Sequence, residues 1–192
     1  MTRLVDILGA AILLLIVLPI LLLIAILIVL DSPGPILFRQ ERIGRDMKPF
    51  LILKLRTMHG ASDAFEFKPQ RITNVGEWLR RWKLDELPQL MNVLRGEMSF
   101  VGPRPEIRKY VEMFRGSYQR LLVRRPGLTD PATLAYRQEA EILANEPDPE
   151  QVYVSRILPE KLRLSEQYAM SRTFRSDIHV LLRTLAAVLI RR

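Results

Sequence analysis

The chain has 192 residues, of which 48% are hydrophobic and 26% are charged, and this size suits one domain with a modest core and a membrane element. It contains no cysteine and only two histidines, so the composition excludes a disulfide framework and a cysteine nucleophile and disfavours a Cys/His zinc site. Lysine and arginine total 29 against 21 acidic residues, and the formal net charge of +8 favours phosphate-bearing partners such as nucleic acid, anionic lipid or nucleotide.

Residues 4–30 are almost continuously apolar and read LVDILGAAILLLIVLPILLLIAILIVL. The core of this run, residues 7–30, exceeds the roughly 20 residues that a helix needs to cross a membrane. A cleaved signal peptide fits poorly, because its apolar region would be about 7–15 residues long with a basic start. A buried soluble helix also fits poorly, because the run has no polar face. We therefore predict a membrane segment at residues 1–30 and a separate domain at residues 31–192, for which the motifs below indicate a catalytic role.

Pro19 lies near the middle of this apolar run, where it removes a backbone hydrogen bond and favours a bend. Length alone does not separate a kinked spanning helix from a hairpin that enters and leaves one leaflet. Six basic residues follow closely and favour the cytoplasmic side: Arg39, Arg42, Arg45, Lys48, Lys54 and Arg56. We expect the catalytic domain to lie on the cytoplasmic face of the membrane.

Residues 31–35 (DSPGP) predict a turn-rich hinge after the membrane segment. Residues 36–44 and 48–58 are rich in β-formers and are separated by Gly44 and Asp46, which is typical of a β-hairpin.

Residues 58–75 predict a polar loop, and residues 76–82 predict a helix. This helix would carry Trp78, Leu79 and Trp82 on one side among basic residues, a mixture that suits the headgroup region of a bilayer. A surface helix with its tryptophans in the core is the alternative, and the sequence leaves both open.

The stretch KLDELPQLMNVLRGEMSFVGPRPE, residues 83–106, predicts a helix that starts near Pro88 and stops at Gly96. Four apolar side chains at helical spacing would face inward: Leu87, Leu90, Met91 and Leu94. Asp85 and Glu86 would then lie at the helix N-terminus. One reading is structural, because an acid there stabilises a helix by roughly 0.3–1 kcal/mol.

The other reading of Asp85 and Glu86 is chemical. We expect the helix dipole and nearby arginines to keep Asp85 ionised, as a nucleophile or a metal ligand requires. The prolines around Arg104 would hold its guanidinium ready for bidentate phosphate contact. A site of hard oxygen ligands points to Mg²⁺. Together these features describe phosphoryl transfer.

Five segments, in this order, carry a resemblance that runs through nearly the whole chain: RLVDILGA, SPGPILFRQERIG, FLILKLRTM, LDELPQLMNVLRGEMSFVGPRP and RRPGLTD. The sequence resembles the small monotopic phosphoglycosyl transferases, the bacterial sugar transferases that start glycan assembly on polyprenyl phosphate. The resemblance implies that Asp85 attacks the β-phosphate of a UDP-sugar and expels UMP, leaving a phosphosugar on the aspartate that polyprenyl (undecaprenyl) phosphate then accepts. It implies that Glu86 positions Mg²⁺, with Asp85 as the other ligand, or assists the incoming phosphate.

The resemblance also assigns four basic residues to substrate. Arg104 carries over as a phosphate ligand, Arg80 matches a basic position before the dyad, Lys54 matches a lysine that lines the site, and Arg125 opens a substrate-handling loop. A solvated basic side chain is the alternative for each. The resemblance further implies that the bend at Pro19 makes a re-entrant hairpin in the cytoplasmic leaflet.

Two departures from the family pattern concern the membrane break and the sugar loop. The family often has Ser-Pro at the break, whereas this chain has Leu18 before Pro19. The sequence after RPGLT continues as a longer loop, so the sugar is not named from the resemblance.

The C-terminal third predicts two helices, one starting at Pro159 and one over residues 176–192. The second carries an apolar stripe that ends in arginines and suits packing against the membrane or the core: Ile178, Leu181, Leu182, Leu185, Val188 and Leu189. The predicted fold is therefore α+β and mostly α, a monotopic domain anchored by a re-entrant helix, with a β-hairpin and amphipathic interface helices.

The expected partners are a UDP-sugar donor, a polyprenyl phosphate acceptor and membrane phospholipids, with no nucleic acid; homo-oligomerisation is left open. The runner-up function is a non-catalytic membrane-surface module whose basic surface binds anionic lipid or phosphate and whose acids only cap a helix. A nucleic-acid binder is a weaker third reading, because no recognised motif accompanies the positive charge.

Overall fold

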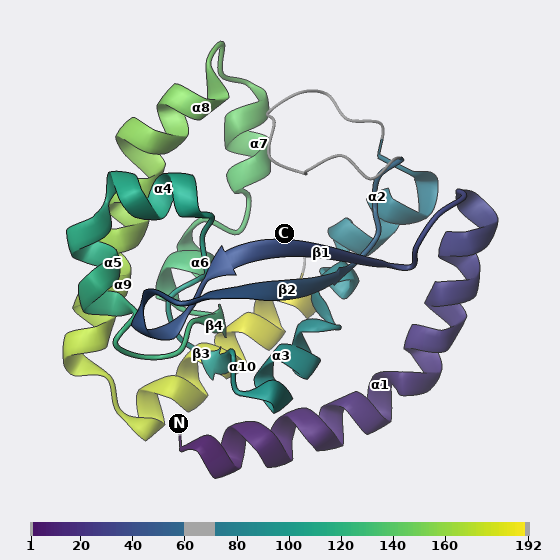
Figure 1. Cartoon of the computed structure of the whole chain (residues 1–192), viewed down its shortest axis with the longest axis horizontal. Coiled ribbons are helices and arrows are strands. Elements are labelled where there is room, and N and C mark those ends of the chain that lie inside the picture. The colour runs from purple at the N-terminus through teal and green to yellow at the C-terminus, as the bar shows by residue number, and fades with distance from the viewer. Residues whose placement is uncertain (1, 60–71, 191–192) are drawn as a thin grey trace. The chain divides into compact units, whose positions relative to one another are not determined.

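The computed structural model describes residues 2–59 and 72–190 and is an α+β structure dominated by helices, as predicted (Figure 1). Its elements are α1 (Arg3–Asp31), β1 (Leu37–Ile43), η1 (Arg45–Met47), β2 (Pro49–Leu55), α2 (Asn74–Arg81), η2 (Leu84–Glu86), α3 (Gln89–Arg95), β3 (Ser99–Val101), α4 (Arg108–Met113), α5 (Arg115–Leu121), β4 (Gly127–Thr129), α6 (Pro131–Ala135), α7 (Glu139–Ala144), α8 (Pro149–Val152), η3 (Tyr153–Ile157), α9 (Leu158–Ser171) and α10 (Phe174–Leu189).

The chain forms two compact units, and each is described by itself. The N-terminal unit comprises Thr2–Glu41 and Leu51–Gly96, and thus contains α1, α2, η2, α3 and most of the hairpin strands. The C-terminal unit comprises Arg42–Phe50, at the turn of the hairpin, and the chain from Glu97 onward.

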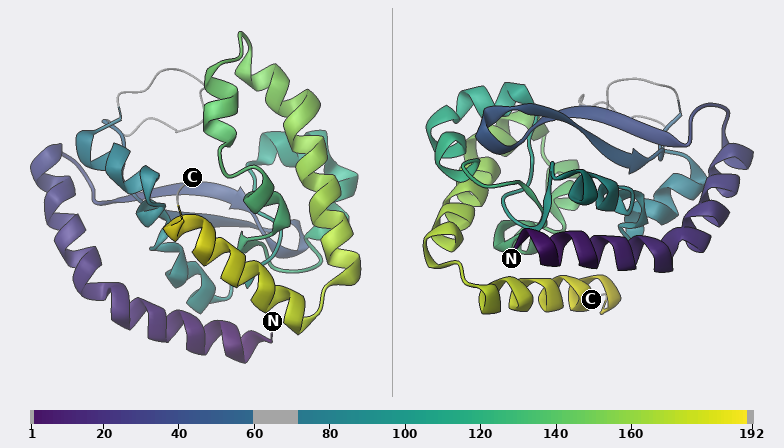
Figure 2. Two further views of the ribbon diagram at one scale, coloured as in Figure 1. Left: turned by 180° about the vertical axis from the view of Figure 1, so that it is seen from behind. Right: turned by 60° about the horizontal axis from the view of Figure 1, so that its bottom comes forward.

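The apolar run forms the single long helix α1, which contains Pro19 and changes direction along its length (Figures 1 and 2). Most of its large apolar side chains are exposed, including Leu15 at 74% and Leu30 at 78%. Within the described residues, α1 is the one helix long and apolar enough to cross a membrane. The helix is confirmed, whereas its re-entrant path in a bilayer stays a prediction.

Both ends of α1 are bonded inside the N-terminal unit. At the start, Arg3 donates from Nη1 to the Val93 carbonyl at 2.6 Å, near the end of α3. At the other end, the Asp31 carboxylate accepts the Val75 N–H at 3.0 Å, at the start of α2. The same unit therefore holds both ends of α1.

The end of α1 is also held by the buried side chain of Arg56, which lies directly after β2. Its Nη2 donates to the Ser32 carbonyl at 2.6 Å and to Ser32 Oγ at 3.0 Å. Gly34 adopts φ +126, and a Cβ there would lie 2.4 Å from Arg56 Nη1. The SPGP hinge therefore needs a glycine both for its backbone and for the guanidinium beside it.

A small apolar core joins α1 to the rest of the N-terminal unit. Ile24 and Ile28 from α1 pack with Leu55 from β2 and Leu79 from α2. This core fixes α2 and β2, the two elements that carry Arg80 and Lys54.

The predicted β-hairpin is confirmed as an antiparallel pair, β1 and β2, joined through η1. Its turn contains two consecutive residues with positive φ, Asp46 and Met47, at 57° and 60°.

The predicted helix after the loop is also confirmed, although α2 begins at Asn74. Most of the predicted loop, residues 60–71, lies outside the described residues. The prediction that Trp78, Leu79 and Trp82 share one side is wrong: Leu79 is fully buried, whereas Trp78 and Trp82 are 45% and 37% exposed. The tryptophans are therefore surface residues rather than core residues.

The C-terminal unit is built around the short parallel pair β3–β4, with Ser99 opposite Gly127 and Val101 opposite Thr129. The two predicted C-terminal helices are confirmed as α9 and α10. On α10, Leu182 and Leu185 are exposed at 60% and 59%, as an interface helix requires. The sequence did not predict the parallel pair or the short helices α4 to α8.

Candidate active site

Asp85 and Glu86 lie in the 3-10 turn η2, one turn before α3 rather than at its first residue. Lys83 precedes them in the left-handed conformation, with φ 56, and reverses the chain after α2. Pro88 is the N-cap of α3 and supplies no side-chain bond. Neither carboxylate therefore acts as the cap that the structural reading proposed.

The predicted inward face of α3 is only partly correct. Leu90 is buried, but Leu87, Met91 and Leu94 are half-buried. The positions buried beside Leu90 include two amides, Gln89 and Asn92. Helical spacing of apolar residues alone did not define the buried face, because the polar side chains of Gln89 and Asn92 occupy part of the interior.

Asp85 is 7% exposed, and its Oδ1 has no hydrogen-bond partner among the described residues. Burial raises the pKa of this carboxyl, and the neighbouring charge of Glu86 raises the pKa further. The cations Lys54, Lys83 and Arg80 lower the pKa without offsetting these two effects. The net shift is therefore opposite in direction to the one expected from the helix dipole and the arginines alone, and the ionised state of Asp85 stays a prediction.

Lys54 and Glu86 form an ion pair beside Asp85, with 3.1 Å between Lys54 Nζ and Glu86 Oε1. Lys54 is positioned by β2, whose Leu53 N–H donates to Asn92 Oδ1 on α3 at 3.1 Å. The ion pair joins a residue of β2 to a residue of η2 that is 32 positions later in the sequence.

Arg80 is positioned by the close approach of α2 to Thr57. A Cβ on Gly76 would lie 2.2 Å from the Thr57 carbonyl oxygen, so only glycine allows this packing. Arg80 Nε donates to Thr57 Oγ1 at 2.9 Å. Burial lowers the pKa of Arg80, and Asp85 raises it, which places the two charges within electrostatic reach. Four predicted site residues, Lys54, Arg80, Asp85 and Glu86, thus meet in the N-terminal unit.

The other two predicted residues, Arg104 and Arg125, lie in the C-terminal unit. Their motifs are adjacent there, because the Gly127 N–H donates to the Pro103 carbonyl at 3.0 Å. A Cβ on Gly102 would lie 2.6 Å from the Arg125 carbonyl oxygen, so the two loops touch through their backbones. That Arg104 and Arg125 serve the same substrate as Asp85 stays a prediction.

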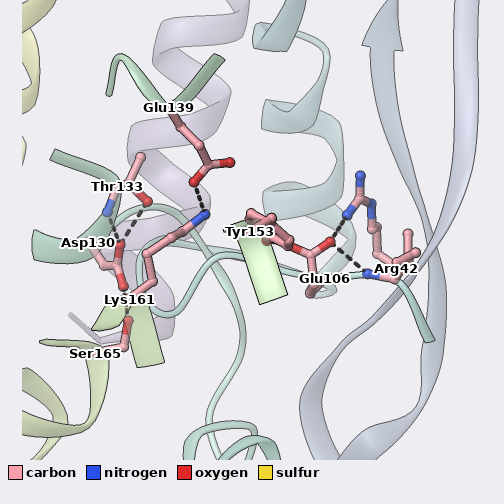
Figure 3. A network of polar contacts seen from close by, with 9 residues as sticks. Arg42, Glu106, Asp130, Thr133, Glu139, Tyr153, Lys161 and Ser165 are labelled. Atoms are coloured by element: carbon pink, nitrogen blue, oxygen red, sulfur yellow. Dashed lines mark hydrogen bonds and ion pairs between the residues drawn. The ribbon is translucent and has the colours of Figure 1, made fainter. Parts of the chain in front are cut away.

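Arg104 lines a small pocket of the C-terminal unit together with Lys161, Asp130 and Ser165. Figure 3 shows the polar side chains of this region: Lys161 bonded to Glu139, and Asp130 bonded to Thr133 and Ser165. The wall of this pocket carries two cations, Arg104 and Lys161, and two acids, Glu106 and Asp130, so its formal charges balance.

Glu106, two residues after Arg104, is at the centre of the second part of this network (Figure 3). Its carboxylate accepts Arg42 Nη1 at 2.5 Å, Tyr153 Oη at 2.8 Å and the Ile107 N–H at 3.0 Å. Its backbone carbonyl accepts the Ile43 N–H at 2.9 Å. Glu106 therefore bonds the loop that contains Arg104 to Arg42 and Ile43, at the end of β1.

The full sequence matches the family model for bacterial sugar transferases over residues 1–191. The chain belongs to this family. The bacterial sugar transferase is 47% identical, over 66% of its length, to the UDP-glucose:undecaprenyl-phosphate glucose-1-phosphate transferase of Caulobacter vibrioides, of which 51% is covered. It is 40% identical to the UDP-N-acetylgalactosamine-undecaprenyl-phosphate N-acetylgalactosaminephosphotransferase of Aeromonas hydrophila, over 71% of this chain and 34% of the relative.

A third relative matches over most of both chains. The exopolysaccharide production protein ExoY of Rhizobium meliloti is 31% identical over 97% of the bacterial sugar transferase and 84% of the relative. The chain therefore spans about half of the first relative, about a third of the second and most of the third. The family that the sequence motifs indicated is confirmed.

The residues of the dyad fit a magnesium ion in kind and number. Mg²⁺ in phosphoryl transfer is typically held by one or two carboxylates, water and substrate phosphates. Asp85 supplies a buried oxygen without a partner in the described chain, and Glu86 lies beside it. In the described ranges, no group of three or more His, Cys, Asp or Glu side chains forms a protein-only metal site.

Sequence reasoning missed three residues of this region: Thr57, Gln89 and Asn92. Thr57 bonds Arg80, and Asn92 holds the strand of Lys54. Gln89 follows Asp85 by four positions, and this spacing is visible in the sequence. The pattern of apolar residues used to predict the helix, however, gave no reason to select Gln89.

Proposed function

We propose that this bacterial sugar transferase moves a sugar phosphate from a UDP-sugar to undecaprenyl phosphate and releases UMP. The names of the Caulobacter and Aeromonas relatives support the donor and acceptor classes, and they differ in the sugar. The observation that carries the proposal is Asp85: a buried carboxylate with an unpartnered oxygen, within the influence of three cations. Such a group is placed to bond a reacting phosphorus.

In the first step an oxygen of ionised Asp85 attacks the β-phosphorus of the donor. A new O–P bond forms, and the bond from that phosphorus to the oxygen bridging to the α-phosphate breaks, so the electron pair leaves with UMP. The cation Arg80 stabilises negative charge on the phosphates as the bond breaks, and Lys54 is a cation beside the attacking carboxylate. Their charges also favour the ionised form of Asp85 against its burial.

In the second step an oxygen of the lipid phosphate attacks the phosphorus on Asp85. The O–P bond to the aspartate breaks, which regenerates the carboxylate and yields a polyprenyl diphosphosugar. The acceptor is already largely ionised near neutral pH, so a general base gains little here. A covalent route gives Asp85 a distinct task and lets a bulky lipid enter after UMP has left.

Magnesium fits this proposal as the cofactor. Asp85 and Glu86 would hold it, and the ion would neutralise charge on the diphosphate of the donor. Lys54, paired with Glu86, would keep that carboxylate oriented toward the site. Arg104 and Arg125 would bind phosphate or sugar from the adjacent loops of the C-terminal unit, and Lys161 shares the pocket with Arg104.

The proposed site of action is the cytoplasmic face of the membrane, and α1 supports a location at the membrane. A spanning helix carries its ends to opposite sides of a hydrocarbon core about 30 Å thick. Here Arg3 and Asp31, at opposite ends of α1, both bond backbone groups of the same unit. This favours a re-entrant helix bent around Pro19, with the catalytic domain and both helix ends on the cytoplasmic face.

Single cysteines test this topology, since the chain has none of its own. Thr2 and Pro33 are exposed positions at the two ends of α1, whereas Ser32 is buried. Cysteines at positions 2 and 33 should react with a membrane-impermeant maleimide only when the cytoplasmic side is open. Labelling of position 2 from the outside would establish a spanning helix.

A burst experiment tests the reaction. Purified enzyme mixed with UDP-sugar and Mg²⁺, without lipid, should release up to about one UMP per active site. Mass spectrometry should find a phosphosugar on the peptide that contains Asp85. Asp85→Asn should give neither product, because an amide is a poor nucleophile, while Glu86→Gln should slow turnover. Strict dependence of UMP release on the lipid, with no adduct, contradicts the two-step route.

A further inference from the structure

Gln89, the first residue of α3, is a buried amide without partners. Its side chain is 1% exposed, and neither Oε1 nor Nε2 forms a hydrogen bond within the described part of the chain. Buried polar groups in native proteins are almost always bonded, and each one left without a partner costs about 1–3 kcal/mol. An amide with both ends unpaired therefore needs an explanation.

Asn92 offers a direct comparison on the same short helix, three residues later. It is also fully buried, but its Oδ1 accepts the Leu53 N–H at 3.1 Å and its Nδ2 donates to the Leu51 carbonyl at 2.7 Å. One buried amide of α3 thus holds β2, whereas the other has no hydrogen-bond partner within residues 2–59 and 72–190.

The position of Gln89 links it to Asp85. Consecutive turns connect the two residues, since the Leu87 N–H donates to the Leu84 carbonyl and the Leu90 N–H to the Leu87 carbonyl. Side chains four residues apart on helical turns are neighbours, with Cβ atoms about 5–6 Å apart in a regular helix. Asp85 Oδ1 likewise has no partner among the described residues. Three unpartnered polar atoms therefore belong to two buried side chains that are four positions apart on consecutive turns.

The chemistry of these atoms specifies what would satisfy them. Gln89 Nε2 needs an acceptor, Gln89 Oε1 needs a donor, and the Asp85 oxygen needs a cation or a donor. A phosphate group supplies acceptors only, and a hydrated divalent cation supplies charge and water O–H donors. A diphosphate with its hydrated cation satisfies all three atoms together.

We propose that Gln89 is a further substrate-binding residue, whose amide contacts the magnesium-diphosphate group of the donor nucleotide beside Asp85. This inference rests on the proposed function, because it places the diphosphate at Asp85. Nε2 donates to a phosphate oxygen, and Oε1 accepts from water on the cation. The alternative is that Gln89 holds buried waters and is purely structural.

The test compares Gln89→Met with Asn92→Ala in the full-length chain. Methionine keeps the length and volume of glutamine and removes both polar ends. Binding of UDP with MgCl₂ is measured by calorimetry, and the melting temperature of each variant is measured without ligand. Gln89→Met should keep the melting temperature within about 2 °C or raise it, and should weaken UDP binding about tenfold. Asn92→Ala should lower the melting temperature, because it removes an amide that the fold itself bonds, and it calibrates the loss expected for a structural amide of α3.

Each other result is decisive. If Gln89→Met melts well below the wild type and binds UDP normally, Gln89 is structural and the inference is overturned. If Gln89→Met neither destabilises the protein nor weakens UDP binding, the inference also fails. Absence of UDP binding and of a UMP burst in the wild type removes the proposed function itself, whereas a normal wild-type burst with unaltered Gln89→Met affinity removes only the role of Gln89.

Discussion

Asp85 in the N-terminal unit and Glu106 in the C-terminal unit are both buried carboxylates, but their surroundings differ. Burial alone would raise the pKa of Glu106, yet Arg42, Lys161, the Ile107 N–H and the Tyr153 hydroxyl together lower it. Burial raises the pKa of Asp85, and its Oδ1 bonds nothing in the described chain.

The difference separates structural from chemical roles. A carboxylate whose oxygens are already bonded has no capacity for a substrate and serves to hold the fold. A buried carboxylate oxygen without a partner destabilises the folded state and is retained where a ligand completes it. The two buried amides of α3 differ in the same way, because Asn92 is bonded within the fold and Gln89 has no partner in the described chain.

The four predictions below test this difference between bonded and unpartnered buried groups, from the largest expected effect to the smallest.

Glu106→Gln should lower the free energy of unfolding by roughly 3–5 kcal/mol at neutral pH, the usual cost of breaking a buried ion pair. The pKa of Glu106 is lowered below its ordinary value of 4.5 in the folded state. Its stabilisation is therefore present above pH 4.5 and is lost as the pH falls through the lower, folded pKa. Denaturation over a pH series measures this loss.

The matched control is Glu112→Gln, because Glu112 pairs with Arg115 on the surface with 46% of its side chain exposed. This variant should unfold like the wild type. A Glu106→Gln protein as stable as the control would show that the bonded carboxylate is not structural.

Arg104→Lys should lower turnover roughly 100-fold, as loss of one transition-state contact does, and should leave stability nearly unchanged. Lysine keeps the charge but loses the planar fork that grips phosphate. Arg104 lies two residues before Glu106. Comparison of Arg104→Lys with Glu106→Gln therefore tests whether one residue of this loop serves activity and the other serves stability. Steady-state kinetics and melting curves provide both readouts. Arg108→Lys, at an exposed position of α4, is the control. Near-normal turnover of Arg104→Lys would remove the phosphate-binding role.

Asp85→Asn should stabilise the metal-free fold at pH 7.5 by about 1 kcal/mol while it abolishes the burst. The folded-state pKa of Asp85 is raised above 3.8, so its ionised form opposes folding at pH values above the folded pKa. The gain should shrink as the pH falls from the folded pKa toward 3.8 and should vanish below 3.8, where both states are protonated. Unfolding in EDTA at several pH values measures the gain. A loss of stability at pH 7.5 would mean that Asp85 supports the fold.

The elements that the sequence predicted are those with strong local signals. The apolar run of α1, the β-formers on either side of Gly44, and the stop of α3 at Gly96 each follow from composition or backbone preference nearby. The parallel pair β3–β4 was not predicted, because three-residue strands joined by a long crossover carry no periodicity. Its formation depends on two glycines that let backbones touch, Gly102 and Gly127.

The candidate site shows the same division. The motifs selected Asp85, Glu86, Lys54 and Arg80, and the structure brings these four together. The sequence did not show that Asp85 is buried with a raised pKa, since burial depends on α2 and β2 packing beside it. It also gave no signal for Gln89, because an unpaired amide is visible only once its surroundings are known.

The smallest effect is expected at Lys54, which lowers the pKa of Asp85 and pairs with Glu86. Lys54→Met removes that cation, so the pKa of Asp85 should rise further. The attacking carboxylate must be ionised, and the burst rate should therefore begin to fall at a higher pH than in the wild type. At pH 6 we expect a loss of about twofold to tenfold that disappears at higher pH.

Burst rates over a pH series measure the effect, with Lys48→Met, an exposed lysine of the hairpin turn, as the control. Recovery at high pH means that Lys54 acts on the ionisation of Asp85. A loss that persists at all pH values means that Lys54 contacts the donor phosphates instead, since a missing contact is not restored by deprotonating Asp85. An unchanged profile would show that Asp85 keeps its reactivity without this cation, and the contrast with Glu106 would then rest on the unpartnered oxygen alone.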